Sequence, residues 1–280
     1  MNKLGESLRL KMILPLAEKI KGLKATYWYH QINEMNMWTR QQVLDWQNQH
    51  LRDFVRHAYE HTKYYKELFD SLGLKPEDIR TAEDLKKLPI LTKDIIRSRY
   101  DDFIPDNLSQ LPHRQDRTGG TTGEPMRFLT SEDTWGYVTA AKMVAWKTTP
   151  YRYGDKFAAL GSASILKEKP SLVRRIYDWI RQEYPMNSMS LNNELCQTYI
   201  DKMRKEGIHY IYGYASSIYL LAKYAHDNQV DVSFIKGAYT TSENLTSTYR
   251  DMIENTFGCR VMDCYGCRDA GVACYEIKSG

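Results

Sequence analysis

RTGGTTGEP, at residues 117–125, is the stretch that decides how the rest of this 280-residue chain is interpreted. Its three glycines let the backbone adopt positive φ angles and approach a ligand closely. Successive amides in such a turn form a concave anion site, and threonine hydroxyls add donors that suit phosphate oxygens. A Walker loop and a dinucleotide fingerprint are both excluded, because neither G-K-S/T nor G-x-G-x-x-G occurs here. A phosphate-binding loop and a flexible surface turn remain as the two interpretations.

Downstream of this loop the sequence alternates between expected strands and helices. We expect helices over 131–146, 193–205, 216–226 and 245–257, and strands over 156–162, 209–212, 232–239 and 260–265. Strands separated by helices of this length imply right-handed crossovers and a mostly parallel sheet. Ligands bind at the carboxyl ends of such strands. Three motif-like segments stand at these ends, namely 213–214, 241–243 and 265–269.

Upstream of the loop, the first hundred residues are expected to be helical. Apolar positions recur at helical spacing over 44–69, and Gly73 is expected to end that helix. A capping box opens a short helix over 81–88, and another short helix is expected over 92–99.

Composition restricts the class of protein. Hydrophobic residues make up 42% and charged residues 26%, as in ordinary globular proteins, and the net charge of +4 is too small to indicate nucleic acid binding. The sequence contains no run of 18 apolar residues, so it predicts no membrane-spanning helix. Residues 1–22 lack the features of a signal peptide. We therefore expect a cytoplasmic protein. This basic amphipathic segment either packs on the protein itself or contacts a membrane surface peripherally. The sequence does not decide whether the chain forms a homodimer.

Two groups of side chains have the spacing of metal ligands. Cys264 and Cys267 are separated by two residues, as in zinc or redox pairs. The alternative is that they are reduced thiols packed as small hydrophobic groups. Asp53, His57 and His61 share a helix face, where a metal site or half-buried histidines are the two interpretations.

Several ordered blocks resemble one known family. The loop at 118–125 looks like the phosphate-binding loop of adenylate-forming enzymes. LRDFVRHAYEHTKYYKELF at 51–69 and LKPEDIRTAEDLKKLPILTKDIIR at 74–97 are similar to the N-terminal region of the phenylacetate–CoA ligase-like family. Three further family blocks follow in the right order, at 211–214, 242–245 and 263–266. The resemblance starts at about residue 38 and is greatest to the subgroup associated with capsular polysaccharide gene clusters.

The resemblance implies a reaction and a set of residues. ATP and a small carboxylic acid would give an acyl-adenylate and pyrophosphate, and the acyl group would pass to coenzyme A or another nucleophile. Catalysis of the first step would consist of positioning and neutralisation of phosphate charge. The residues implied to hold the β- and γ-phosphates are Thr118, Gly119, Gly120, Thr121, Thr122 and Gly123. Those implied to bind the rest of the nucleotide are Ser242, Glu243, Asn244, Asp263, Tyr265 and Gly266.

Thr122 and Asp269 are the residues that the resemblance implies in catalysis. Asp269 stands where relatives usually have glutamate, and its carboxylate is expected to hold Mg²⁺, which prefers oxygen ligands. Cys267 and Arg268 replace the small hydroxyl residues usual after Tyr-Gly, and Ile277 stands where many relatives have cysteine.

The implied fold is the α/β large domain of an adenylate-forming enzyme, with mostly parallel sheets flanked by helices. Residues 1–110 are expected to form its helical N-terminal region, and residues 111–280 an incomplete nucleotide-binding part. The family's ribose-binding aspartate, catalytic lysine and small C-terminal domain are expected to be absent, so residues 1–280 should not exchange pyrophosphate into ATP. The alternative is a truncated, catalytically inactive relative that acts as a binding or scaffold protein in surface polysaccharide biosynthesis.

Overall fold

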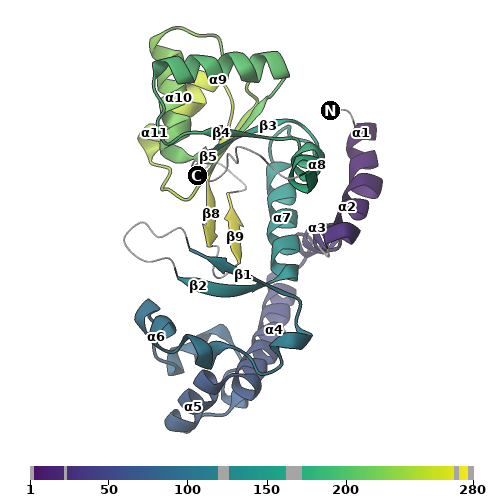
Figure 1. The fold of residues 1–280 in the computed structure, drawn as a ribbon, viewed down its shortest axis with the longest axis vertical. Helices are drawn as coiled ribbons and strands as arrows, with labels where there is room; N and C mark the ends of the chain where they lie inside the picture. The colour runs from purple at the N-terminus through teal and green to yellow at the C-terminus, as the bar shows by residue number, and fades with distance from the viewer. Residues whose placement is uncertain (1–2, 22–23, 119–125, 162–171, 268–270, 277–280) are drawn as a thin grey trace. The chain divides into compact units, whose positions relative to one another are not determined.

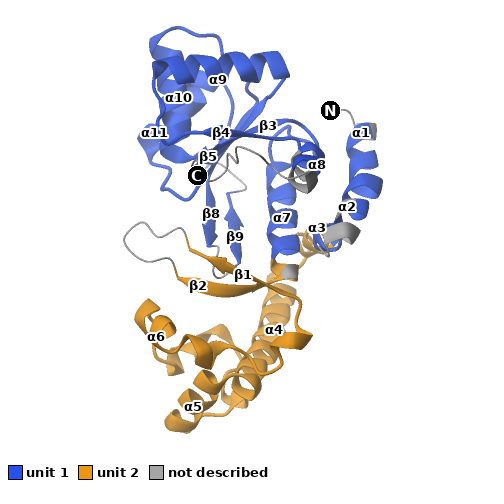
Figure 2. Cartoon of the chain, viewed as in Figure 1, with its two compact units in different colours: residues 1–30, 135–280 blue, residues 31–134 orange. Residues whose placement is uncertain are grey.

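The structure is a computed structural model that describes residues 3–21, 24–118, 126–161, 172–267 and 271–276. The chain divides into two compact units (Figure 2). Unit 1 comprises residues 1–30 and 135–280, and unit 2 comprises residues 31–134. Within the described residues, we find no helix that combines the length and the apolar character needed to cross a membrane.

Unit 1 is built on a parallel sheet, of which β3, β4 and β5 are labelled in Figure 1. Its strand order is β4-β3-β5-β6-β7. The strands are β3 (Phe157–Gly161), β4 (Glu183–Asn187), β5 (Tyr210–Tyr214), β6 (Gly237–Thr241) and β7 (Val261–Met262). The helices between and before them are α7 (Glu132–Trp146), α8 (Leu172–Arg181), α9 (Asn193–Glu206), α10 (Ala215–Asp227) and α11 (Ser247–Phe257). The expected α/β architecture, with a parallel sheet flanked by helices, is confirmed.

The two faces of this sheet carry different cores, because successive strand side chains point to opposite faces. Ile211, Ala238 and Val261 face α9, α10 and α11, whose buried side chains complete a mainly aliphatic core. On the other face, the core is largely aromatic and includes Trp146 of α7. The indole ring of Trp146 stacks on Tyr239 at a centroid distance of 4.0 Å. The sheet is therefore held between one aliphatic layer and one aromatic layer.

The remaining elements of unit 1 lie near the chain ends. The N-terminal ones are α1 (Lys3–Leu8), a π-helical turn (Arg9–Ile13), α2 (Leu14–Lys21) and the start of α3 (Ala25–Met35). After β7, the strands β8 (Cys264–Cys267) and β9 (Val272–Tyr275) pair with each other antiparallel.

Unit 2 contains mostly helices and a single described hairpin. The helices are α4 (Arg40–His61), α5 (Lys63–Leu72) and α6 (Lys93–Ser98), with 3₁₀ turns at Pro76–Asp78, Ala82–Lys87, Tyr100–Phe103 and Leu108–Gln110. The hairpin pairs β1 (His113–Arg117) with β2 (Arg127–Ser131) antiparallel. The expected helical character of the first hundred residues is confirmed.

The helix expected over 44–69 is interrupted at Thr62. This residue is extended, with φ −123° and ψ 135°, and its hydroxyl accepts a hydrogen bond from the Tyr65 amide while donating to the Ala58 carbonyl. One threonine therefore caps both helix ends, because a β-branched side chain with a hydroxyl suits a cap better than a helix interior. Gly73 ends α5 with φ +65°, as expected.

Two strand predictions were wrong in their bounds. The strand expected from residue 232 begins only at Gly237, although Val232 and Ile235 are buried in the aliphatic core. The strand expected over 260–265 breaks at Asp263, where the chain leaves the parallel sheet and starts β8. Val232 and Ile235 are buried without belonging to a strand, and their apolar spacing in the sequence resembles that of a strand. The helix α8 and the edge strand β4 were not predicted.

Candidate functional site

The motif-bearing ends of three adjacent strands meet at the carboxyl edge of the sheet in unit 1. Tyr214 at the end of β5 is paired with Thr241 at the end of β6, and β6 is paired with β7, which Asp263 follows. The sequence prediction that segments 213–214 and 241–243 stand at strand ends is confirmed. The parallel register therefore gathers polar groups that lie far apart in the sequence.

Gly213 lets the strands β5 and β3 approach at this edge. A Cβ atom at residue 213 would lie 2.4 Å from the carbonyl oxygen of Leu160 and 2.7 Å from its Cβ. Both contacts are far shorter than van der Waals distances, and one is to backbone that cannot rotate away. The glycine is thus required by packing within the sheet.

We expect Gly213→Ala to lower the free energy of unfolding of the chain by about 1–3 kcal/mol, the usual cost of overpacking a well-packed core. Gly266→Ala is the matched control, because a Cβ there would meet nothing nearer than the Val272 carbonyl oxygen at 3.7 Å. Urea unfolding measures both variants. Equal stability of Gly213→Ala and the parent chain would contradict the packing role.

Glu243 links the end of β6 to the start of α10. Its Oε2 accepts a hydrogen bond of 2.9 Å from the Ser216 amide, in the first turn of a helix whose N-cap, Tyr214, makes no side-chain cap. An acceptor and a negative charge both suit the unpaired amides and positive dipole at a helix N-terminus. The adjacent Ser242 has φ +65°, a value that non-glycine residues seldom adopt and that often marks functional sites. Asn244 is exposed beside them.

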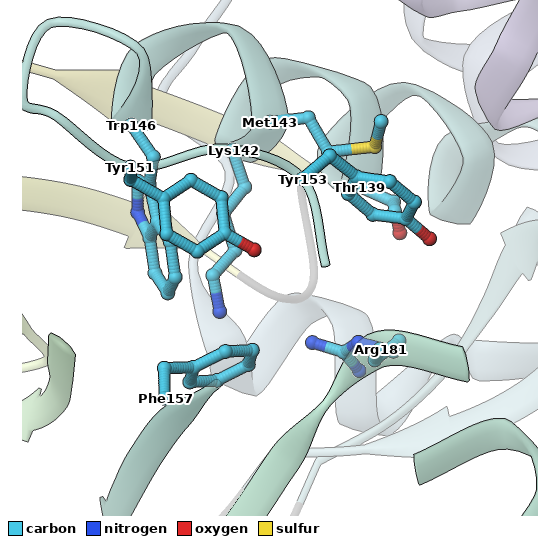
Figure 3. Close-up of a pocket in the computed structure, with 8 residues that line it drawn as sticks. All are labelled: Thr139, Lys142, Met143, Trp146, Tyr151, Tyr153, Phe157 and Arg181. Carbon is cyan, nitrogen blue, oxygen red and sulfur yellow. The ribbon is translucent and has the colours of Figure 1, made fainter. Parts of the chain in front are cut away.

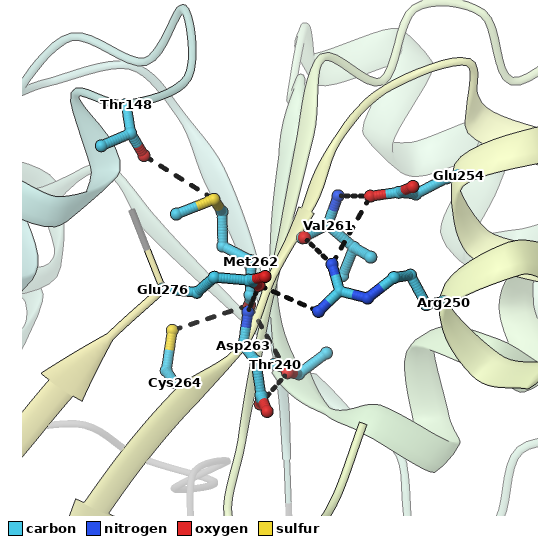
Figure 4. A network of polar contacts seen from close by, with 9 residues as sticks. All are labelled: Thr148, Thr240, Arg250, Glu254, Val261, Met262, Asp263, Cys264 and Glu276. Carbon is cyan, nitrogen blue, oxygen red and sulfur yellow. Dashed lines mark hydrogen bonds and ion pairs between the residues drawn. The ribbon is translucent and has the colours of Figure 1, made fainter. Parts of the chain in front are cut away.

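Asp263 is fixed in position at the point where β7 ends (Figure 4). Its Oδ1 accepts a hydrogen bond of 2.9 Å from the hydroxyl of Thr240, which is fully buried. Its amide donates to Oε2 of Glu276 at 3.1 Å, and the Glu276 amide donates to the Asp263 carbonyl at 2.9 Å. Arg250 neutralises Glu276 through a contact of 2.9 Å. These bonds tie β6, β7 and the segment after β9 together and leave the Asp263 carboxylate little freedom.

Beyond Asp263, the strand β8 presents aromatic surface. The Tyr265 side chain is 69% exposed, so its ring face is open to a stacking partner. Gly266 is exposed as well. Asp269 lies outside the described residues, and its expected magnesium role stays a prediction.

Thr118 is the one expected loop residue within the described part of the chain, and it belongs to unit 2. Its amide donates to the Met126 carbonyl at 3.0 Å, and its hydroxyl accepts from the Met126 amide at 3.0 Å. These bonds extend the β1–β2 ladder by one step and close the base of the glycine-threonine loop. Gly119, Gly120, Thr121, Thr122 and Gly123 lie outside the described residues.

Lys142 on α7 is a buried cation that the sequence analysis missed. Its Nζ lies 3.6 Å from the ring centroid of Tyr212, 4.2 Å from that of Trp146 and 4.9 Å from that of Phe157. It points into a small cavity that Arg181 also lines (Figure 3). Burial, and to a smaller extent the nearby Arg181, lowers the pKa of Lys142 to about 7. The only sequence signal was one lysine within the apolar run VTAAKMVAW.

Cys264 and Cys267 are not part of a metal-binding cluster within the described residues. Cys264 is buried in the aromatic core, where burial raises its thiol pKa to about 12, as expected for a thiol packed as a small hydrophobic group. Among the described residues, no cluster of three or more His, Cys, Asp or Glu side chains is arranged to hold a metal.

The histidine pair on α4 contacts other side chains. The rings of His57 and His61 stack at a centroid distance of 4.7 Å, and Nδ1 of His61 lies 2.7 Å from Oδ1 of Asp106.

No family model matches the chain. Protein CapK of Staphylococcus aureus is 27% identical over 279 residues, which cover 95% of this chain and 60% of CapK. The phenylacetate-coenzyme A ligase of Aromatoleum evansii is 34% identical over 106 residues, which cover 35% of this chain and 23% of that protein. The resemblance to the phenylacetate–CoA ligase-like family is confirmed. This chain spans only part of the length of each of these relatives.

Solved structures of 2-hydroxyisobutyryl-CoA ligase share the fold of this chain. One is an open conformation in complex with 2-HIB-AMP and CoA, with a TM-score of 0.59, 17% identity and coverage of 81% of this chain and 51% of that one. Another is the postadenylation state in complex with R3-HIB-AMP, with a TM-score of 0.61, 17% identity and coverage of 82% and 49%. The chain thus shares its fold with about half of each of these ligase chains.

Proposed function

We propose that this chain supplies nucleotide-binding parts of an enzyme that uses ATP to convert a small carboxylic acid to an acyl-adenylate. The observation that supports this most directly is the carboxyl edge of the sheet, where Glu243 and Asp263 follow the adjacent strands β6 and β7 and Tyr265 lies in β8 directly beyond. Two relatives are named phenylacetate-coenzyme A ligase, which favours coenzyme A as the acceptor of the acyl group.

In this proposal, the edge residues act by binding and orientation. Glu243 holds the start of α10 and thereby fixes the strained backbone at Ser242 beside the adenine. The exposed ring of Tyr265 stacks on the base, a contact that contributes roughly 1–3 kcal/mol in nucleic-acid binding proteins. The loop at 118–123 neutralises phosphate charge as the acid attacks the α-phosphorus. Orientation and charge neutralisation are the main sources of catalysis in such transfers.

Binding of a stable acyl-adenylate mimic tests the proposal in the chain as it is. We expect phenylacetyl-sulfamoyladenosine to bind residues 1–280 at least tenfold more tightly than AMP, because the mimic also occupies the acid position. Titration calorimetry with both compounds measures the difference. Binding of neither compound would contradict the nucleotide site. Equal binding of both would remove the support for acid activation and favour the alternative function, a catalytically inactive binding or scaffold protein in surface polysaccharide biosynthesis.

A further inference from the structure

Unit 2 contains an apolar cavity that takes no part in the proposed adenylation site. The cavity measures about 340 Å³, which falls within the size range of small-molecule sites. Helix α4, the chain from Tyr100 to Pro112 and the β1–β2 hairpin all contribute to its wall. Its apolar lining includes Phe54, Tyr65, Ile96, Phe103, Leu108 and Leu129. Phe54 is 70% exposed at this site, so apolar surface remains uncovered.

One buried hydroxyl in the wall of this cavity lacks a hydrogen-bond partner among the described residues. Thr130 of β2 lines the cavity and is only 6% exposed, yet no described group bonds to its Oγ1. Buried polar atoms are nearly always paired, and an unpaired one is costly. A ligand with an oxygen acceptor in the cavity would complete this hydroxyl.

The wall of this cavity carries basic side chains and no described acidic one. His57, His113 and Arg127 line the cavity, and no described Asp or Glu side chain does. Arg127 lies over the Tyr100 ring at 5.4 Å and forms no ion pair with another described residue. The nearby Asp106 is already held by His61 at 2.7 Å. The site therefore combines an apolar interior with an arginine that has no ion-pair partner in the described part of the chain.

We propose that this cavity binds a small apolar carboxylic acid. The hydrocarbon part fills the apolar interior, and the guanidinium of Arg127 supplies the charge opposite the carboxylate. The Thr130 hydroxyl donates a hydrogen bond to a ligand oxygen. Guanidinium groups pair particularly well with carboxylates. None of the residues that line this cavity is among those proposed to bind the nucleotide.

Octanoate and its uncharged analogue octanol are the probes, titrated into residues 1–280 and followed by ligand-observed NMR. We expect Arg127→Gln to weaken octanoate binding about tenfold and to leave octanol binding nearly unchanged, because only octanoate carries the charge. Arg97→Gln is the matched control, since Arg97 is an arginine of unit 2 outside this cavity. Ala58→Trp, which fills the cavity from α4, should abolish binding of both probes.

Thr130→Val separates a ligand role from a structural role. We expect it to raise the melting temperature of the ligand-free chain, because it removes an unpaired buried hydroxyl, and to weaken octanoate binding severalfold. If the Thr130 hydroxyl instead stabilised the fold, Thr130→Val would lower the melting temperature.

Three results would overturn the proposal. The first is no octanoate binding at millimolar concentration. The second is equal octanoate binding by Arg127→Gln and the parent chain. The third is a dimer, seen by sedimentation, that does not bind octanoate. Each leaves the proposed function intact if the acyl-adenylate mimic still binds, so the two failures are distinguishable.

Discussion

Replacing Thr121 and Thr122 together by alanine is expected to lower the affinity of the chain for Mg·ATP by a hundredfold or more. Each hydroxyl is proposed to donate a hydrogen bond to a charged phosphate, and such bonds contribute roughly 1.5–3 kcal/mol. Two of them amount to about 3–6 kcal/mol, and each 1.4 kcal/mol is a factor of ten in binding. Titration calorimetry of the double variant measures the loss.

The glycine-threonine loop can be altered in this way without loss of its anchor. The two bonds between Thr118 and Met126 that close its base are made by other residues. Thr198→Ala is the control, because Thr198 is an exposed threonine on α9 of unit 1. Unchanged ATP affinity in the double variant would show that the loop is not the phosphate site, whatever its sequence resembles.

Local sequence signals predicted most of the helices and the parallel arrangement of the strands. Gly73 ends its helix as expected, since a glycine at a helix C-terminus adopts positive φ without strain. Thr62 was misread, because one threonine in a periodic apolar pattern does not show whether it caps or continues a helix. Strand β4 was missed because Pro185 lies in it, and proline is tolerated there only because β4 is an edge strand.

Part of the candidate site was also predictable from local sequence motifs. The ends of β5 and β6 could be located from the motifs, because parallel strands bring their carboxyl ends to one edge. The bond from Glu243 to Ser216 could not be predicted, since it joins residues 27 positions apart through the β5–β6 register. The unpaired Thr130 hydroxyl has no sequence signature at all, because burial of one atom depends on every element around it.

Lys142→Met is expected to raise the free energy of unfolding at pH 7 by up to about 4 kcal/mol. The pKa of Lys142 is lowered from its ordinary value near 10.5 to about 7, mainly by burial and then by Arg181, while Glu183 and Cys264 act in the opposite direction. One pKa unit corresponds to about 1.4 kcal/mol, so holding this amine in the core is costly at neutral pH. Three aromatic rings around Nζ offset part of that cost through cation–π attraction.

The sign of the pH dependence follows from the protons bound in each state. Between about pH 7 and 10.5 the unfolded chain keeps a proton on Lys142 that the folded chain releases, so Lys142 makes stability rise with pH across this window. Urea unfolding from pH 6 to pH 9, below the range in which the raised thiol pKa values of Cys259 and Cys264 lower stability, should show this rise in the parent chain and a flatter profile in Lys142→Met. Lys202→Met, at an exposed position on α9, should keep the parent profile. If Lys142→Met instead lowered stability at pH 7, the aromatic rings would outweigh desolvation, and Lys142 would be charged in the folded core.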